Sequence, residues 1–161
     1  MQKVATVVGV ISDTHGRLRP EALDALRDVS RILHAGDIGS PDLLAKLSAL
    51  APVMAIRGNI DTGQWAGDLP DTLSVEIESA RVYLIHKLAD LTIDPAAGGY
   101  HAVISGHSHR PSQSVRDGVL YLNPGSAGPR RFRLPVTLAR LLIDGSKLQV
   151  EIVPLPERGE K

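Results

Sequence analysis

The sequence contains no cysteine, which excludes disulfide bonds and thiolate metal sites. Aromatic residues make up only 3% of the 161 residues, so the stacking platforms typical of proteins that bind single-stranded nucleic acid are not expected. The formal net charge is zero, which gives no electrostatic support for a general affinity for nucleic acids or membrane surfaces. No apolar run is long enough to span a bilayer, and the N-terminus lacks the length and cleavage site of a signal peptide. We therefore expect a cytoplasmic protein that does not associate with membranes.

The remaining composition is that of an ordinary globular protein, with 43% hydrophobic and 22% charged residues. Its length predicts a single domain, residues 1–161, with one substantial core.

The first third of the chain alternates predicted strands and helices. Apolar runs at residues 6–12, 31–35 and 53–56 predict strands covered on both faces. A helical pattern that opens at Pro20 and places Leu26 and Val29 on one side separates the first two strands. A second helix is predicted over residues 41–50, with Ser40 as its N-cap. This order favours a parallel sheet with right-handed crossovers.

The rest of the chain is typical of antiparallel structure. Hairpins are predicted at residues 73–78 with 81–86, at 112–115 with 119–122, and at 135–143 with 148–153, and a buried strand at 102–105. We therefore expect an α/β (α+β) fold with two packed β-sheets and helices outside them.

Polar side chains of metal-ligand type follow five of the predicted strands, several directly after a glycine. They are Asp13 and His15, Asp37, Asn59, His86, and His107 and His109. The carboxyl ends of strands form the crevice where open α/β sheets bind ligands. Each short motif alone would be an ordinary turn or cap, but the ordered set favours a binding site.

Carboxylates, imidazoles and an amide, without thiolates, suit divalent ions such as Mn²⁺, Fe²⁺, Zn²⁺ or Ni²⁺. Seven ligands exceed the needs of one ion. They match two ions roughly 3.5–4 Å apart that share a bridging carboxylate and leave positions open for water and substrate.

The ordered set D-x-H, G-D, G-N, H and G-H-x-H resembles the calcineurin-like metallophosphoesterase superfamily. The segments VISDTHG, LHAGDIGS, IRGNID and YLNPGSAGPR are similar to its small bacterial and archaeal phosphodiesterase branch. The resemblance extends from about Val8 to Ile152. It implies a metallophosphoesterase-like sandwich of two stacked mixed β-sheets flanked by helices.

The resemblance also implies a binuclear metal centre in which Asp37 bridges two divalent ions, Mn²⁺ being the first expectation and Ni²⁺, Fe²⁺, Co²⁺ or Zn²⁺ the alternatives. A hydroxide between the ions would attack phosphorus. Because His107 and His109 are expected on one side of an extended segment, each can reach a different ion. The implied ligands are Asp13, His15, Asp37 and His109 for the first ion, and Asp37, Asn59, His86 and His107 for the second.

Catalytic roles are expected for Asp37, Asn59 and His86. The superfamily often has a histidine general acid after the ligand asparagine, but Ile60 stands there, so water or Asp61 is left as proton donor. Asp61 can equally be a partner that orients a ligand, or a plain turn residue.

Asn59, Lys87 and Arg131 are the candidate substrate-binding residues. Lys87 follows His86 where the family usually has glycine, so it either narrows the site or binds the substrate phosphate. Arg131, with Arg130, either steers phosphate or is a solvated basic pair.

Three further features are expected to support the site or the core. His34 is interpreted as a core histidine that can orient a ligand. Trp65 is interpreted as a core residue, with a lid over the cleft as the alternative. Segment 123–126 is interpreted as a turn that can shape the loop beside the site.

We therefore expect a metal-dependent phosphodiesterase that acts on a small diester. One alternative is a phosphomonoesterase or nucleotide phosphatase. The other is a protein-binding scaffold similar to a subunit of the retromer coat; that subunit has an altered metal site. Neutral charge and the lack of an extra domain disfavour a nuclease. Homo-oligomerisation is left open.

Overall fold

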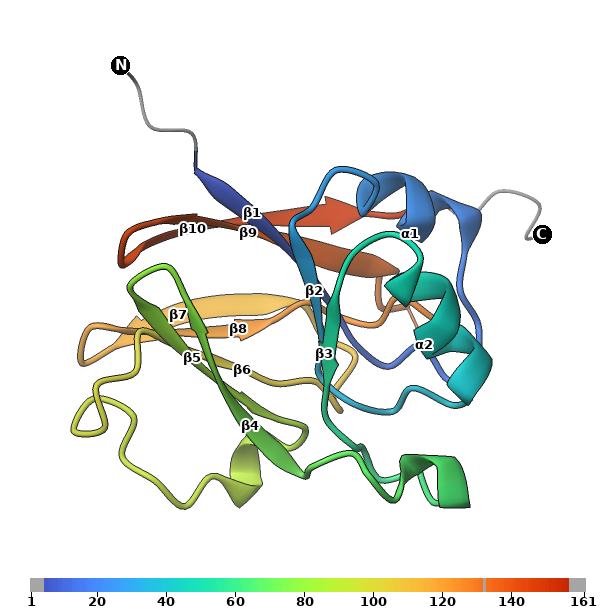
Figure 1. The fold of residues 1–161 in the computed structure, drawn as a ribbon, viewed down its shortest axis with the longest axis horizontal. Helices are drawn as coiled ribbons and strands as arrows, with labels where there is room; N and C mark the ends of the chain where they lie inside the picture. The colour runs from blue at the N-terminus through green and yellow to red at the C-terminus, as the bar shows by residue number, and fades with distance from the viewer. Residues whose placement is uncertain (1–4, 132, 157–161) are drawn as a thin grey trace.

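Two five-stranded β-sheets form the centre of the molecule (Figure 1). The computed structural model describes residues 5–131 and 133–156. The first sheet has the order β10-β9-β1-β2-β3, and the second has the order β4-β5-β6-β8-β7. The strands of the first sheet are β10 (Lys147–Pro154), β9 (Thr137–Asp144), β1 (Thr6–Ile11), β2 (Arg31–His34) and β3 (Val53–Ala55). Those of the second are β4 (Thr72–Ile77), β5 (Ala80–Ile85), β6 (Ala102–Ile104), β8 (Val119–Asn123) and β7 (Ser112–Arg116).

Both sheets are mixed, as the sequence predicts. In the first sheet, β1, β2 and β3 are parallel, and β9 pairs antiparallel with both β1 and β10. In the second sheet, β5, β6 and β8 are parallel, and the outer strands β4 and β7 pair antiparallel with their neighbours. The three predicted hairpins are confirmed as β4–β5, β7–β8 and β9–β10.

The main core lies between the two sheets. Val8 and Val10 of β1 belong to the same buried cluster as Leu84 of β5 and Ile104 of β6. Successive residues of a strand point to opposite faces, so Ile11 lies on the other face of the first sheet, in a second cluster with residues of the helices. The layers are therefore helices, first sheet and second sheet, and the helices lie on one side only (Figure 1).

The two α-helices are α1 (Pro20–Ala25) and α2 (Pro41–Ser48). Both begin with proline, whose fixed φ suits the first helical position. Ser40 is the N-cap of α2 as predicted, although within the described residues its side chain makes no capping hydrogen bond.

The expected length of the first helix is wrong. It ends at Ala25 rather than near Val29, because the backbone leaves the helical region at Leu26. Leu26 and Val29 are nevertheless buried beneath it. Gly9 makes this packing possible, since a Cβ atom on Gly9 would lie 2.3 Å from Leu26 Cδ2.

Two 3₁₀ turns complete the elements, η1 (Gln64–Ala66) and η2 (Leu88–Asp90). Trp65 in η1 packs against the cluster beneath the helices, which supports its interpretation as a core residue. Within residues 5–131 and 133–156, every helix is too short or too polar to cross a membrane.

Candidate metal centre

The seven candidate ligands follow strands of both sheets at one end of the sandwich. The first sheet supplies Asp13 and His15 after β1, Asp37 after β2, and Asn59 after β3. The second sheet supplies His86 after β5, and His107 and His109 after β6. The parallel strands of each sheet end together, which brings these loops into one region.

The backbone turns sharply at most of these positions. Positive φ angles occur at five of the seven candidate ligands, at values between 48° and 73°, and they are Asp13, His15, Asp37, His107 and His109. This region is unfavourable for residues with a Cβ atom, and such strain is concentrated at functional sites. In the described part of the chain, the other two such non-glycine residues are Glu78 and Asp117, where hairpins turn.

The expectation that His107 and His109 lie on an extended segment is therefore wrong. Strand β6 ends at Ile104, and both histidines have left-handed φ angles, 73° and 64°. Their side chains nevertheless point to different groups of donor atoms. Tight turns, and not the alternation of a strand, separate the two imidazoles.

Two groups of donor atoms meet in space. In each group, one ligand atom from every residue lies within 4.8 Å of the others; the groups are Asp13, His15 and His109, and Asp37, His86 and His107. This grouping agrees with the assignment that the resemblance implies. Asn59 is exposed and lines a cleft with His86 and Lys87.

In both Asp13 and Asp37, one carboxylate oxygen accepts hydrogen bonds from the protein and the other faces the site. Asp13 Oδ2 accepts hydrogen bonds from Ser12 Oγ at 2.7 Å and from the His107 amide at 3.0 Å. Asp37 Oδ1 accepts one from the Ile60 amide at 3.0 Å. The remaining oxygens, Asp13 Oδ1 and Asp37 Oδ2, face the imidazoles.

The distances between these remaining oxygens and the imidazole nitrogens link the two groups. Asp37 Oδ2 lies 3.3 Å from His86 Nε2 and 3.6 Å from His15 Nε2, so it adjoins both groups. Asp13 Oδ1 lies 3.5 Å from His109 Nε2 and 3.8 Å from His86 Nε2. Two donor atoms that each lie about 2 Å from one ion are separated by roughly 3 Å. The spacing therefore fits donor atoms arranged around cations.

Hydrogen bonding leaves a nitrogen lone pair of His86 facing the carboxylates. His86 Nδ1 lies 2.7 Å from the Ala35 carbonyl oxygen, so it must carry the proton and donate it. In the neutral ring Nε2 is then an acceptor, and it faces the acceptor Asp37 Oδ2 at 3.3 Å. Two acceptors at this distance need a proton or a metal ion between them.

Buried polar atoms without a hydrogen-bond partner mark the same place. Asp13 Oδ1, His15 Nε2 and His86 Nε2 are all buried and unpaired in the described part of the chain. Such atoms cost free energy unless something binds them. The residues present therefore fit a divalent cation, with the carboxylate and imidazole donors that such ions prefer.

The electrostatics of the cluster favour the deprotonated forms that bind metals. Burial lowers the pKa values of His15 and His107, and burial with the charge of Arg131 lowers the pKa of His109 to about 4. Burial alone would raise the pKa of Asp37, but the neighbouring His86 ring and the Ile60 amide outweigh it and bring the value to about 2. Neutral imidazoles and an ionised carboxylate are therefore present at neutral pH.

The pKa values of Asp13 and His86 shift upward, in contrast to those of Asp37 and the other three candidate imidazole ligands. Burial raises the pKa of Asp13 to about 6, against the opposing hydrogen bond from Ser12. Burial also acts to lower the pKa of His86, but Asp37, the Ala35 carbonyl and Asp13 raise it. A cation bound to these groups would compete with protons for the same atoms.

His34 orients the loop between Asp13 and His15. Its ring is fully buried, Nδ1 accepts a hydrogen bond from the Gly36 amide at 3.1 Å, and Nε2 donates to Thr14 Oγ1 at 3.0 Å. Thr14 Oγ1 in turn donates to the Ile38 carbonyl. This chain supports the interpretation of His34 as a core histidine that positions the ligand loops.

The buried carboxylate of Asp61 holds three loop amides by hydrogen bonds. Its Oδ2 accepts hydrogen bonds from the Ile38 amide at 3.0 Å and the Gly58 amide at 2.9 Å, and its Oδ1 accepts one from the Gly39 amide at 2.9 Å. The residue is 1% exposed. These bonds favour a role in holding the loops of Asp37 and Asn59 over a role as proton donor.

Segment 123–126, which the sequence predicts to be a turn beside the site, also joins the two sheets, and the sequence did not predict this role. Asn123 Nδ2 donates to the Gly106 carbonyl and to Ser108 Oγ, each at 3.1 Å. Ser126 Oγ donates to the Asp13 carbonyl at 2.9 Å. The segment therefore connects the β1 loop with the histidine loop, and its turn-forming sequence NPGS was the available signal.

Lys87 and Arg131 lie beside the two groups. Lys87 is half-buried, and its charge adds to the effect of burial in lowering the pKa of His107. Arg131 is exposed, and its charge adds to the effect of burial in lowering the pKa values of His15 and His109. A substrate-binding role for either residue stays a prediction.

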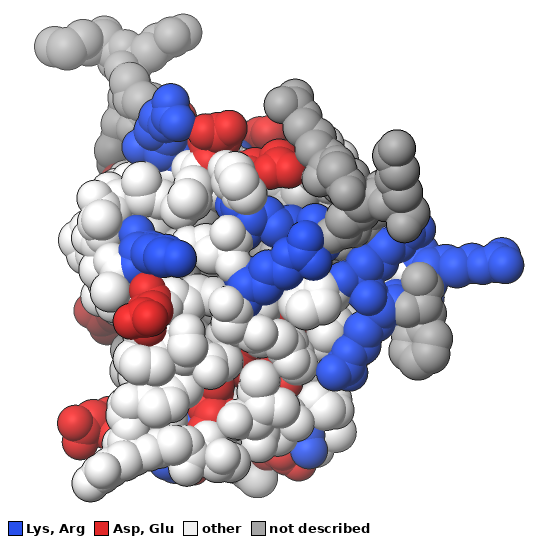
Figure 2. Space-filling view, turned by 90° about the vertical axis from the view of Figure 1, so that its right-hand side faces the viewer, with Lys and Arg blue, Asp and Glu red and all other residues white. Residues whose placement is uncertain are grey.

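Surface charge is mixed around this part of the molecule. Figure 2 shows the face at the right of Figure 1, where Lys and Arg side chains are most numerous from the middle to the right-hand side, and Asp and Glu atoms lie at the top, at the left and recessed in the lower half. The positive patch is thus bordered by negative charge, in keeping with a net charge of zero.

Comparisons with known proteins identify the family of this chain. The family model for the calcineurin-like phosphoesterase superfamily domain matches residues 7–146. A probable metallophosphoesterase of Methanothermobacter thermautotrophicus is 42% identical over 91% of each chain. The chain therefore belongs to the calcineurin-like phosphoesterase superfamily, as the motifs indicate.

Solved structures confirm the fold. A structure described as a novel archaeal phosphodiesterase is 26% identical, covers 91% of this chain and 99% of its own, and has a TM-score of 0.76. Vacuolar protein sorting 29 of Cryptosporidium parvum is 18% identical, covers 96% of this chain and 100% of its own, and has a TM-score of 0.77. The second likeness concerns the fold alone.

Proposed function

We propose that this protein is a phosphodiesterase that works with two divalent metal ions, Mn²⁺ being the first candidate. The observation that carries the proposal is the set of buried, unpaired donor atoms Asp13 Oδ1, His15 Nε2 and His86 Nε2, turned toward one another at the junction of the two sheets. A scaffold that does not bind metal would not keep such atoms buried without partners.

The first group, Asp13, His15 and His109, would hold one ion, and the second, with His86 and His107, would hold the other. Asp37 Oδ2 adjoins both groups, which suits it to bridge the ions. Bound ions would supply Lewis acidity toward the phosphate oxygens and lower the pKa of a bound water molecule. Asn59 would complete the second group from the exposed side.

The protein's own residues then decide which esters fit. Two hollows, each of about 400 Å³, open on either side of Lys87. One contains His107, and the other contains Asn59 and His86. A diester has two substituents on phosphorus, and the two hollows can take one each. Lys87 between them would bind a phosphate oxygen as a point charge.

The test measures hydrolysis of bis(p-nitrophenyl) phosphate by metal-stripped protein before and after Mn²⁺ is added. We expect activity only with the metal. Asp37→Asn should abolish it, because the amide can keep the Ile60 hydrogen bond while its NH₂ group replaces the charged oxygen that faces the imidazoles. The matched control is Asp68→Asn, an exposed carboxylate, which should keep full activity.

Each alternative has its own outcome. Faster hydrolysis of p-nitrophenyl phosphate than of the diester would indicate a phosphomonoesterase. Metal binding in calorimetry without turnover of either ester, with Mn²⁺, Ni²⁺, Co²⁺ or Zn²⁺, would favour a protein-binding scaffold. Loss of activity in both Asp variants would show that the effect of Asp37→Asn is not specific.

A further inference from the structure

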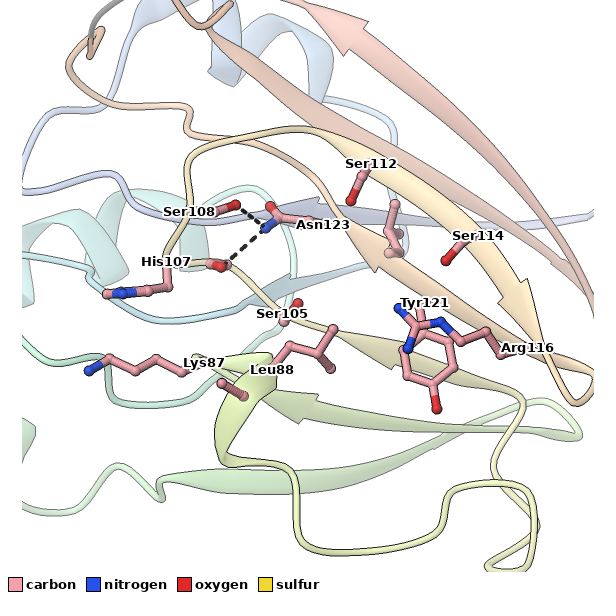
Figure 3. Close-up of a pocket in the computed structure, with 13 residues that line it drawn as sticks. Lys87, Leu88, Ser105, His107, Ser108, Ser112, Ser114, Arg116, Tyr121 and Asn123 are labelled. Carbon is pink, nitrogen blue, oxygen red and sulfur yellow. Dashed lines mark hydrogen bonds between the residues drawn. The ribbon is translucent and has the colours of Figure 1, made fainter.

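A groove runs away from the candidate metal centre across the outer face of the second sheet. Figure 3 shows Lys87 and His107 at one end of this groove, and Arg116 and Tyr121 at the other. Its volume is about 400 Å³. The 3₁₀ turn η2 forms one wall, and the β7–β8 hairpin forms the floor.

Strand register explains why polar side chains line the floor. Residues two apart on a strand share a face, so Ser112, Ser114 and Arg116 of β7 point to the same side. Ser112 pairs with Asn123 and Ser114 pairs with Tyr121 on the neighbouring strand. Arg116 is four steps along the strand from Ser112, which at about 3.3 Å a step gives the floor a length of about 13 Å.

The charge of the groove differs from that of the whole chain. The chain carries 18 acidic and 18 basic residues. Among the described residues that line the groove, Lys87 and Arg116 are cationic and none is acidic. The groove therefore presents positive charge at both ends and none of the opposite sign in its lining.

The far end of the groove presents a flat surface. The guanidinium carbon of Arg116 lies over the Tyr121 ring, 4.7 Å from its centre. Arg116 is exposed, so its guanidinium group is accessible to a ligand. Arginine planes of this kind stack on nucleobases.

We propose that this groove binds the nucleoside part of a nucleotide phosphodiester, with the base on the Arg116 guanidinium and the sugar along Ser112 and Ser114. The inference rests on the proposed function, because the scissile phosphate would lie at the metal centre beside Lys87 and His107. The groove is then the specificity-determining part of the site, and the hydroxyl groups on its floor supply hydrogen bonds to the sugar.

Two substrates with the same leaving group separate groove binding from chemistry. They are thymidine 5′-(p-nitrophenyl phosphate) and methyl p-nitrophenyl phosphate, hydrolysed by the Mn²⁺-loaded protein. The methyl group is too small to reach the groove, so the ratio of the two kcat/KM values measures what the nucleoside contributes. We expect the ratio to favour the thymidine ester.

Arg116→Ala should lower this ratio about tenfold, since the stacking of the base on the guanidinium is lost, while kcat/KM for the methyl ester stays unchanged. Arg116→Lys should lose most of the preference as well, because lysine keeps the charge but not the plane. Arg81→Ala is the matched control: Arg81 lies 4.3 Å from the centre of the Tyr100 ring and is not part of the groove.

The proposal is overturned if the wild type shows no preference for the thymidine ester, or if Arg116→Ala leaves the ratio unchanged. Failure to hydrolyse both esters would instead refute the proposed function. In that case, calorimetric titration of the Mn²⁺-loaded protein with thymidine 5′-monophosphate decides the question. Binding that Arg116→Ala weakens about tenfold supports the groove, and absence of binding overturns it.

Discussion

Asp61→Asn tests whether this buried carboxylate fastens the loops or donates a proton. In the folded protein its two oxygen atoms accept three backbone hydrogen bonds, from Ile38, Gly39 and Gly58. An asparagine side chain offers one oxygen and one NH₂ group. The asparagine keeps the most hydrogen bonds if its oxygen takes the place of Oδ2. The bonds from the Ile38 and Gly58 amides are then retained, and the NH₂ group points at the Gly39 amide, whose bond is lost.

The size of the effect follows from these bonds. One hydrogen bond to a charged group is lost, at roughly 1.5–3 kcal/mol, and two others change from charged to neutral acceptors, at about 1 kcal/mol each. Relief of the cost of burying a charge offsets part of this. We expect the free energy of unfolding to fall by about 3 kcal/mol.

Urea denaturation of the metal-free protein at pH 7, followed by circular dichroism, measures this change. Asp68→Asn provides the control, because this carboxylate is exposed and its replacement should change stability by less than about 0.5 kcal/mol. A decrease for Asp61→Asn no larger than that of the control would refute the fastening role.

Kinetics separate the two roles of Asp61. A general acid matters most for poor leaving groups, so its loss would slow a diester with an alkyl leaving group far more than a p-nitrophenyl ester. If Asp61 only holds the loops of Asp37 and Asn59, its replacement would slow hydrolysis of both substrates equally, because Mn²⁺ binding is weakened. We expect the second result.

Two more predictions concern buried groups near the site. Burial lowers the pKa of His34 to about 3. Between pH 6.5 and pH 3 the unfolded chain therefore binds a proton that the folded protein does not. The free energy of unfolding of the metal-free protein should fall by about 2 kcal/mol from pH 7 to pH 5. Urea denaturation should show a smaller decline in His34→Gln, and an identical decline would contradict the assignment. In Gly58→Ala the new Cβ atom would lie 2.2 Å from the Asp37 amide nitrogen and Oδ1, so calorimetry should show Mn²⁺ affinity reduced at least tenfold. Gly67→Ala, whose Cβ atom would have its nearest contact at 3.2 Å, should bind Mn²⁺ as the wild type does.

Much of the fold was predictable because it follows from local patterns. Alternation of apolar and polar residues identified the hairpins, and continuous apolar runs identified the buried strands β1 and β2. The patterns were least accurate at the ends of elements, where tertiary contacts compete with local preference. Helix α1 stops at Ala25 because Leu26 and Val29 are buried against the first sheet in a non-helical turn.

The candidate ligands were predictable because their residue types and order are specific. Their geometry was not, since it depends on left-handed backbone turns at residues such as His107 and His109. The geometry also depends on close contacts between the two sheets. At Gly106, for example, a Cβ atom would lie 2.1 Å from Ser12 Oγ of the other sheet's loop. No pattern along the chain reveals such an approach. The single-domain organisation, the cytoplasmic location and the oligomeric state stay predictions.

The sequence by itself determined the set of candidate metal-binding side chains, because covalent order alone places each of them after an apolar strand. Only the tertiary structure decided which oxygen of Asp13 or Asp37 faces the site, which nitrogen of His34 carries the proton, and that Asp61 is saturated by backbone amides. It also decided that the hairpin β7–β8 forms the floor of a groove beside His107. These properties arise from hydrogen bonds and packing between segments far apart in the chain, so they exist only once the two sheets have met.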